Sequence, residues 1–396
     1  MFLDLGGTVR TRSAEHTLAW VEPLLPKFGI TRLAALEGLG NLKIPVTICF
    51  RPNGRGQSTS QGKGINRVLA DVSAIMEAVE LFHAERLPQA SMVASVAELR
   101  RSGRPFVDPV RLSKHPHESL YSEHEPLGWL ELRRATDGGA ILAPRFYLDL
   151  DRAAQPTEIS SIAFDATSNG LASGNTLEEA IVHGLYELIE RHCFTEYIEL
   201  DLAQRRARSL QLDTIGESPH VRELRSALAA SGLGLAVRSV HGPLGIPAFR
   251  ARIQPLDRDD RTPGTSGFGA HFVADVALAR AITEAAQGRI TKIAGSRDDF
   301  YPHTYRYIDE AILSDRPGAP PPESPGLAWN EIPRPPPFSS FAQALAWTLE
   351  RLASLGFRDT CYFDQRRPEL GNIPIVSVVS PMLRFDRSTF YRGEQE

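Results

Sequence analysis

Two Glu-x-x-Glu pairs in separate predicted helices are the part of the sequence most able to carry chemistry. Glu77 and Glu80 stand in "AIMEAVELFHAE", and Glu187 and Glu190 stand in "HGLYELIER". A spacing of three residues places both carboxylates of a pair on one face of a helix. Carboxylates gathered in one place need cations, and magnesium takes such oxygen ligands and commonly shares them with phosphates. A solvated helix face would give the same pattern, so spacing alone leaves both interpretations open.

Residues that could bind an anion stand close to these pairs in the sequence. Lys63 lies in "SQGKG" and Asn175 in "SGNT", where small residues let the backbone approach an anion. Asn175 also precedes a helix N-terminus, where negative charge is favoured. Arg191 adjoins Glu190. The "QGKG" segment lacks the G-x-x-x-x-G-K-[ST] spacing of a Walker motif, so an ordinary turn accounts for it equally well.

A third predicted helix carries a further polar face. In "LARAITEAAQGRI" the residues Arg280, Glu284 and Gln287 recur at i, i+4 and i+7 and therefore share one side of the helix. An ion-paired surface stripe explains them as well as a ligand-binding face does. His271, in the preceding "FGAHF", fits either a site residue or the structural end of a strand.

Two other kinds of site are weaker alternatives. Glu80 and His83 have the Glu-x-x-His spacing of di-iron carboxylate bundles, but the predicted strands disfavour a four-helix bundle. Cys193 follows the Glu-Arg cluster closely, yet a free cysteine is more often a small buried apolar residue than a nucleophile. No Ser-His-Asp set can be identified from spacing.

Composition bounds the class of protein. The chain has 396 residues, of which 42% are hydrophobic and 23% charged, as in an ordinary globular protein. A net charge of -4 gives no electrostatic footprint for nucleic acid or for an anionic membrane. No apolar run approaches the roughly 20 residues of a membrane span, and the N-terminus lacks a signal-peptide pattern. Three scattered cysteines cannot form a disulfide framework. We expect a cytoplasmic protein with reduced thiols.

The sequence around these residues predicts a mixture of strands and helices. Helices are expected at 14–25, 68–86, 176–191, 221–232, 275–295 and 340–356, and strands at 44–52, 235–240, 247–253 and 373–379. Thr176 is the predicted N-cap of the helix at 176–191, with Glu179 as its capping-box partner. Residues 53–64 are predicted to be a loop, and 145–150 and 161–166 short strands. Strands and helices do not alternate strictly, which favours an α+β or mixed α/β fold.

Three long motifs together resemble the signature of the YcaO family: "SQGKG...VSAIMEAVELFHAE", "SNGLASGNTLEEAIVHGLYELIER" and "FGAH...ALARAITEAAQGR...SRDD". The lead-in "GITRLAALEGLG" and the residues up to "SQGKG" are most similar to the subgroup that works with TfuA proteins. The resemblance covers roughly residues 10–385. It implies an α+β fold of mixed and antiparallel sheets packed by helices around a central ATP site. It also implies an N-terminal segment 1–43 that packs on a catalytic domain 44–396, with a proline-rich internal loop at 315–338.

The resemblance assigns roles residue by residue. Magnesium ions that bridge the phosphates of ATP would be held by Glu77, Glu80, Glu187, Glu190 and, less directly, Glu284. Nucleotide contacts would come from Thr17, Lys63, Asn175, Glu179, Arg191, Arg280 and Gln287. The catalytic set would be Glu187, Glu190, Arg191 and Arg280. Arg297 also matches a motif position.

The implied activity is ATP-dependent modification of a backbone amide in a ribosomally made precursor peptide. A nucleophile adds to the amide carbonyl, the resulting oxyanion attacks the γ-phosphate, and phosphate leaves with the oxygen. Sulfide as nucleophile gives a thioamide, a Cys, Ser or Thr side chain gives an azoline, and an amine gives an amidine. A non-catalytic nucleotide-binding scaffold is a further alternative.

Two departures from the family pattern bear on this choice. The chain ends in "FYRGEQE" and lacks the P-x-P-x-P tail of many azoline-forming members, which favours thioamide formation with a TfuA-like partner. Ala172 stands where some members have Ser, which removes one expected nucleotide contact. About 40 residues precede the catalytic body, so we expect a separate partner to bind the leader peptide or deliver sulfur. The family also implies a homodimer.

Overall fold

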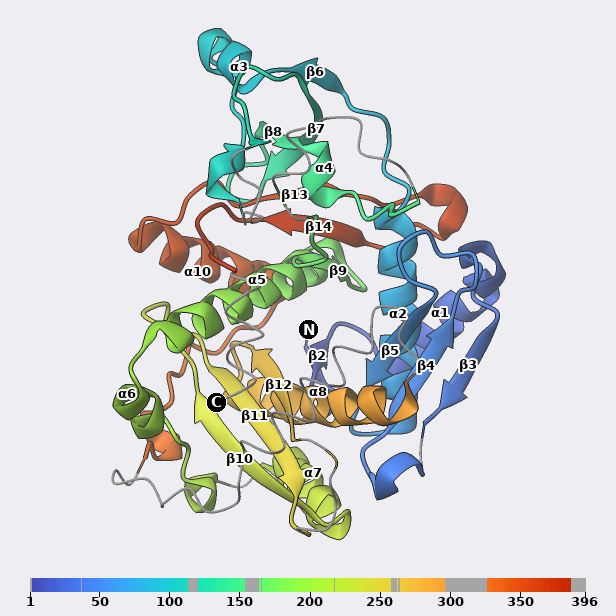
Figure 1. Ribbon diagram of the computed structural model, residues 1–396, viewed down its shortest axis with the longest axis vertical. Coiled ribbons are helices and arrows are strands. Elements are labelled where there is room, and N and C mark those ends of the chain that lie inside the picture. The colour runs from blue at the N-terminus through green and yellow to red at the C-terminus, as the bar shows by residue number, and fades with distance from the viewer. Residues whose placement is uncertain are drawn as a thin grey trace.

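Three long helices cross the middle of the computed structural model. They are α2 (Arg67–Ala84), α5 (Leu177–Glu199) and α8 (Ala274–Ala294), and Figure 1 shows them around the short strand β2 (Val9–Arg10). The structure describes residues 2–36, 38–112, 120–153, 164, 166–216, 218–257, 262, 264–295 and 326–385. Four sheets pack against these helices. This arrangement confirms the predicted α+β class.

Two of the long helices follow three-stranded antiparallel sheets of the same kind. The first sheet has the order β3 (Arg32–Ala35), β4 (Val46–Phe50), β5 (Thr59–Lys63) and leads into α2. The second has the order β10 (Leu233–Ser239), β11 (Ala248–Pro255), β12 (Thr265–Ala270) and leads into α8. In each unit the last strand lies against the helix that follows it. The same β-β-β-α arrangement therefore occurs twice, although the sequence shows no repeat.

Glycines set the distance between strand and helix in both units. A Cβ on Gly62 in β5 would lie 2.1 Å from the Ala70 carbonyl oxygen of α2. A Cβ on Gly267 in β12 would lie 2.1 Å from the Ala285 nitrogen of α8. Glycine in a strand often marks such a close backbone approach. The loop predicted at 53–64 was wrong in its second half, because Thr59–Lys63 form strand β5, in which Gly62 lies close to α2.

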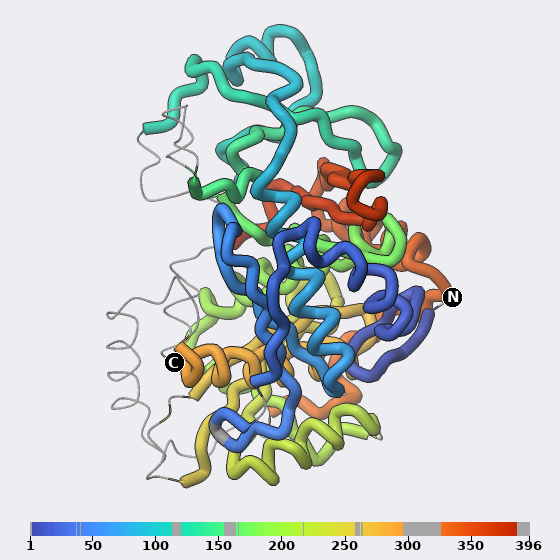
Figure 2. Tube along the Cα trace, turned by 90° about the vertical axis from the view of Figure 1, so that its right-hand side faces the viewer, coloured from blue at the N-terminus to red at the C-terminus, as the bar shows by residue number. Residues whose placement is uncertain are grey.

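The largest sheet has the order β6 (Met92–Ala94), β7 (Leu127–Arg134), β13 (Cys361–Asp364), β14 (Ile375–Val379) and β9 (Leu171–Ser173), and β8 (Ala140–Pro144) pairs with β7. Helix α5 covers β14 and β9, where Val376 and Val378 join Ile181 and Leu185 in one apolar core. The sheet extends beyond α5 to β7 and β8 at one end of the molecule, a separation visible in both Figure 1 and Figure 2. Helix α7 and β10 lie at the opposite end.

The N-terminal segment packs against the rest of the fold and contributes a strand to one of its sheets. It contains β1 (Leu3–Asp4), β2, α1 (Ala14–Val21) and the 3-10 helix η1 (Glu22–Phe28). Ser13 caps α1 by accepting a hydrogen bond from the His16 amide. Strand β3, also from this segment, pairs with β4. The other α-helices of the described residues are α3 (Val96–Ser102), α4 (Arg145–Leu148), α6 (Leu202–Ala207), α7 (Pro219–Ala230) and α10 (Phe341–Ser354).

Most predicted helices and strands are confirmed within a few residues. The strand predicted at 145–150 was wrong, because Arg145–Leu148 form α4. Helix α5 is longer than expected and ends at Glu199. The predicted strand at 161–166 lies mostly outside the described residues. Across the described residues, no helix combines the length and the apolar character needed to cross a membrane.

Candidate functional site

The two Glu-x-x-Glu pairs come together in space, as their spacing allowed. Burial, together with the charges of Glu77 on its own helix and Glu187 on α5, raises the pKa of Glu80 to about 8, although hydrogen bonds with Ser173 oppose the shift. Burial likewise raises the pKa of Glu187 to about 7, with a further contribution from Glu190. Carboxylates that act on one another's pKa lie near one another, because charges interact weakly across long distances in water. Helices α2 and α5 therefore present one acidic surface.

Strand β12 holds the acidic side chains of α5 and α8 through its backbone. The Ala270 amide donates to Glu190 at 3.1 Å, and the Phe268 amide donates to Glu284 at 3.3 Å. Glu284 also accepts from the Lys63 ammonium at 2.7 Å. Burial alone would raise the pKa of Glu284, but the charges of Lys63 and Arg191 outweigh it and lower that pKa. Lys63 and Glu284 thus join β5 to α8 across the site.

Two arginines face the carboxylates from α5 and α8. Arg191 lies 3.7 Å from Glu190, and its guanidinium stands 5.9 Å from the centre of the Phe268 ring. Both terminal nitrogens of Arg280 lie 3.2 Å from Nε2 of His183. Burial lowers the pKa of His183 well below its usual value, so this ring is neutral and its Nε2 accepts. The Nε atom of Arg280 is buried and has no hydrogen-bond partner among the described residues.

The predicted nucleotide contacts near the start of α5 form one hydrogen-bond network. Thr17 donates to the Asn175 side chain at 2.9 Å, and Asn175 donates to Glu179 at 3.1 Å. Glu179 also accepts from the amide and hydroxyl of Thr11 at 2.9 and 2.6 Å and from Arg10 at 3.3 Å. The N-terminal segment is thereby fastened to α5.

The capping-box prediction for α5 was half right. Thr176 accepts a hydrogen bond from the Glu179 amide, as predicted for an N-cap. The Glu179 side chain does not complete the box, because Arg10, Thr11 and Asn175 occupy its carboxylate.

Sequence reasoning missed three residues of this region. Arg10 and Thr11 lie far from α5 in the chain, and only a short basic run, "VRTRS", precedes α1. His183 stands on the polar stripe of α5 but had no assigned role. The stripe was the one signal that could have singled it out, since it lies between Glu179 and Glu187 at helical spacing.

Gln287 supports the strand that carries Lys63. Its Nε2 donates to the Gln61 carbonyl at 2.6 Å. Thr291, one turn further along α8, also bonds the Gln61 side chain. Arg297 lies outside the described residues.

Three residues weighed as alternatives have other surroundings. His83 bonds the Val79 carbonyl and packs on the Phe28 and Phe82 rings in an apolar core, which removes the di-iron alternative. Cys193 is buried, and burial raises the pKa of its thiol to about 12, so it is not a ready nucleophile. His271 is buried and accepts from the Val273 amide, which fits the end of a strand.

The carboxylates converge without closing a coordination shell. Among the described residues, no three His, Cys, Asp or Glu side chains stand close enough to hold a metal ion by themselves. The site brings acidic side chains of α2 and α5 close to the basic side chains of Lys63, Arg191 and Arg280. Such a pairing can hold a cation and a polyanion side by side.

Comparison with known proteins is consistent with this geometry. Residues 61–384 match the family described as YcaO cyclodehydratase, ATP- and Mg2+-binding. A protein from Rhizobium leguminosarum bv. trifolii, described as an uncharacterized protein in the tfuA 3' region, is 32% identical over 389 residues. That match covers 96% of this chain and 90% of the relative.

Two solved structures share the fold. YcaO from Methanopyrus kandleri, bound with AMPPCP and Mg2+, is 22% identical with a TM-score of 0.71 and covers 98% of this chain and 96% of its own. A heterocyclase in complex with substrate and cofactor is 21% identical with a TM-score of 0.77. It covers 95% of this chain, which spans 53% of the heterocyclase chain. With its family match over most of its length, this chain belongs to the YcaO family, whose members bind ATP and Mg2+.

Proposed function

We propose that this protein uses ATP to exchange the oxygen of a peptide backbone amide for sulfur, together with a TfuA-like partner. The observation that carries the proposal is that carboxylates from α2 and α5, half-buried at Glu80 and Glu187 and buried at Glu190, lie near one another and near Lys63, Arg191 and Arg280. A folded protein gains nothing from Glu80 and Glu187 in such surroundings unless cations join them.

The residues present fit magnesium and a triphosphate. Glu77, Glu80, Glu187 and Glu190 offer hard oxygen ligands. Burial first, and neighbouring carboxylates second, raise the pKa values of Glu80 and Glu187, and a bound cation would favour their charged forms. Arg280 has a buried Nε–H without a partner among the described residues, which suits a phosphate oxygen. Magnesium, when bound, neutralises charge on the phosphates.

The chain's own residues then have distinct tasks. Arg191 and Arg280 would orient the γ-phosphate, and Lys63 would leave Glu284 to reach a phosphate oxygen. The Thr17–Asn175–Glu179 network would fix the start of α5 against the nucleotide. Amide, hydrosulfide and ATP would give thioamide, ADP and hydrogen phosphate. The amide oxygen leaves on the phosphate, and the proton of hydrosulfide ends there too.

Sulfide is the proposed nucleophile because the relative from the tfuA 3' region aligns with nearly all of this chain. A TfuA-like partner would deliver sulfur or bind the leader of a precursor peptide. Azoline formation is the second candidate, favoured by the likeness to the heterocyclase. Homodimer formation remains a prediction.

Calorimetric titration of Mg2+ and ATP into wild-type protein and Glu187→Ala tests the site. We expect magnesium-dependent ATP binding that the substitution removes while the protein stays folded. Adding peptide, sulfide and a TfuA partner then tests the chemistry by mass spectrometry. A thioamide appears as oxygen exchanged for sulfur, whereas an azoline appears as the loss of one water. ATP binding equal in both proteins would overturn the assignment of Glu187.

A further inference from the structure

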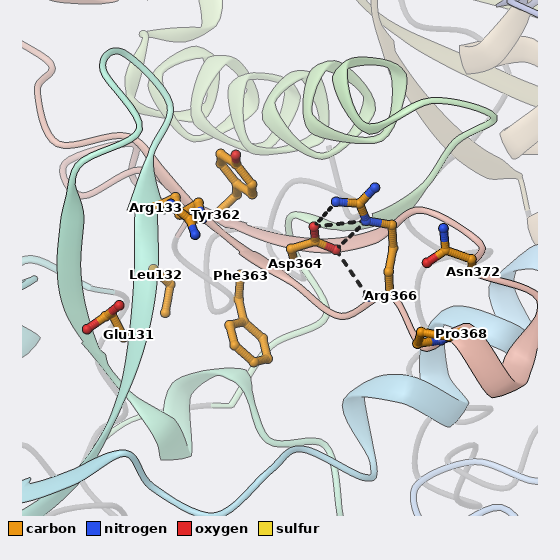
Figure 3. Close-up of a pocket in the computed structure, with 9 residues that line it drawn as sticks. All are labelled: Glu131, Leu132, Arg133, Tyr362, Phe363, Asp364, Arg366, Pro368 and Asn372. Carbon is orange, nitrogen blue, oxygen red and sulfur yellow. Dashed lines mark hydrogen bonds and ion pairs between the residues drawn. The ribbon is translucent and has the colours of Figure 1, made fainter.

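A cavity interrupts the largest sheet, away from the carboxylates of α2 and α5. It measures about 520 Å³, within the roughly 300–1,000 Å³ typical of ligand sites. Figure 3 shows it between β7 and β13, with Glu131, Leu132 and Arg133 on one side and Tyr362, Phe363 and Asp364 on the other. The cavity therefore opens between two strands of one sheet.

The two strands start as neighbours and then part. Their pairing includes Cys361 with Arg134 and Tyr362 with Arg133, and it stops there. In the part of the chain that the structure describes, no ladder pair joins Glu131 to Asp364, the next hydrogen-bonding position. Strand β6 pairs with β7 only from Leu127 to Trp129. Among the described residues, one stretch of β7 therefore has no paired strand on this side.

The backbone of Glu131 faces the cavity. Its partner on β8 is Leu142, which turns its own N–H and C=O away from β7 to Pro105 and Val107. Residues 129, 131 and 133 of β7 thus direct their backbone groups to the side of β6 and β13, as the bond from the Ser91 amide to the Trp129 carbonyl confirms. Glu131 presents one donor and one acceptor there.

Asp364 faces the same space from β13. The Gln365 amide bonds Ile375 of β14, and the Ala135 amide bonds the Thr360 carbonyl. Even-numbered residues of β13 therefore turn their backbone groups toward β7. Two strand edges confront each other across the cavity with matching donors and acceptors, as a missing strand would require.

The side chains give the space two different faces. Leu132 and Phe363 belong to an apolar core below the sheet. Arg133, Tyr362 and Asp364 lie on the other face, where Arg366 binds the Asp364 carboxylate through Nε and Nη2 at 2.9 and 2.5 Å. A strand placed here would alternate apolar side chains toward the core with polar ones toward the charged rim.

The cavity is connected to the candidate site through the sheet. Strand β13 pairs with β14, which pairs with β9, whose Ser173 contacts Glu80. The charge of Glu178, in the first turn of α5, acts on Arg366 at the rim of the cavity. Its neighbour Glu179 lies in the network that fastens the N-terminus to α5. The two places are joined by one sheet and one helix end.

We propose that an extended segment of the substrate peptide enters this gap as an additional strand between β7 and β13. Main-chain hydrogen bonds to Glu131 and Asp364 would hold segments of varied sequence, and the apolar floor would select alternate side chains. The inference rests on the proposed function, since it identifies the occupant as the peptide that the enzyme modifies.

Hydrogen exchange with a defined probe tests the proposal. The probe is a mixture of acetylated, amidated pentapeptides with randomised side chains, added to the full chain. We expect the Glu131 and Asp364 amides to exchange more slowly, by about tenfold at a peptide concentration about ten times the Kd. A matched mixture with N-methylated backbones should give no protection. Protection by both mixtures, or by neither, overturns the proposal.

Two variants at one position separate backbone from side chain. Glu131→Pro removes the N–H that faces the cavity and leaves the β8 ladder intact, so pentapeptide protection at Asp364 should disappear. Glu131→Ala keeps that N–H and should retain protection within about twofold. Protection that persists in a folded Glu131→Pro protein contradicts the inference. If that variant does not fold, the comparison of the two peptide mixtures decides.

Titration of Mg2+ and ATP into the same proteins keeps the two proposals apart. ATP binding that survives in Glu131→Pro while peptide protection is lost supports a separate peptide site. ATP binding without any peptide protection overturns the peptide site and leaves the nucleotide site standing. Peptide protection without ATP binding would instead overturn the proposed function.

Discussion

Helix α2 carries two glutamates with opposite surroundings, five residues apart. Glu85, at its C-cap, receives both terminal nitrogens of Arg51 at 2.7 and 2.5 Å and the Gly56 amide at 2.9 Å. Burial would raise the pKa of Glu85, but the hydrogen bonds and charge of Arg51 lower it. Glu80 has other carboxylates as neighbours, and its pKa is raised to about 8.

Under the proposed function, the difference separates a structural carboxylate from one that serves a ligand. Arg51 and Glu85 are both almost fully buried, and their ion pair balances both charges inside the protein. The charges that act on Glu80 are those of Glu77 and Glu187, and under the proposed function a bound cation would balance them. A carboxylate that serves a ligand lowers the stability of the ligand-free protein and is retained because function needs it. The predictions below test this contrast.

The largest effect on folding is expected from Glu85→Gln. Losing the carboxylate leaves the buried Arg51 guanidinium uncompensated, which lowers the free energy of unfolding by about 3–5 kcal/mol. Urea denaturation of the variant and the wild type measures this. Magnesium-dependent ATP affinity of the folded variant should stay within about twofold. A stability loss below about 1 kcal/mol would contradict the structural role.

The matched substitution Glu80→Gln should have the opposite profile. We expect magnesium-dependent ATP affinity to fall about 100-fold, equal to about 2.7 kcal/mol, because one oxygen ligand loses its charge. Stability of the nucleotide-free protein at pH 8 should stay equal or increase. Calorimetry with ATP and Mg2+ checks the first part, and urea denaturation the second. Unchanged affinity together with lower stability would place Glu80 with the structural carboxylates.

The pH dependence of stability should differ between the two positions. A glutamate with a raised pKa holds its proton more tightly when folded, so Glu80 lowers stability as pH rises from 4.5 to about 8. Glu85 has a lowered pKa, so its contribution is present above pH 4.5 and is lost on acidification. Without metal, Glu80→Gln should flatten the wild-type decline by about 2 kcal/mol between pH 5 and 8, as measured by urea denaturation. Parallel curves would contradict this.

The smallest effect is expected at His83, the third buried ionisable group near the end of α2. Burial lowers its pKa to about 4, so the neutral ring stabilises the fold above pH 6.5, and this is lost as pH falls toward 4. At pH 5.5 the wild type should lose about 1 kcal/mol relative to pH 7, and His83→Gln should not. Urea denaturation at the two pH values measures it. An equal loss in both proteins would assign the effect to other groups.

Local patterns predicted the elements but not their partners. Helical periodicity fixed which side chains share a face, but the spacing of Glu77, Glu80, Glu187 and Glu190 left open whether the two pairs meet or are solvated separately. The pairing of Arg51 with Glu85 could not be foreseen, since it joins a strand end to a helix end. The same holds for Arg10 and Thr11, which reach α5 only through the N-terminal fold.

The gap between β7 and β13 could not be predicted from the sequence either. Glu131 and Asp364 line the same cavity only because β13 joins a sheet whose strand β7 lies more than 200 residues earlier in the chain. Nothing local marks where such a ladder stops. Strand β5 was missed for a different reason. Glycine has a low strand propensity, so Gly62 favoured the prediction of a loop. In the structure Gly62 lies in a strand, where the missing side chain allows close contact with α2.

The glycine contacts of the two β-β-β-α units have a consequence for variant screens in living cells. Any side chain at Gly62 or Gly267 collides with helix backbone, so substitutions there will reduce the amount of protein that accumulates. An activity-based screen alone would class both glycines with the proposed ligand-binding residues. Recording cellular abundance beside activity separates the groups: we expect the glycine variants to lose protein, and the variants of the proposed carboxylate site to remain abundant but inactive.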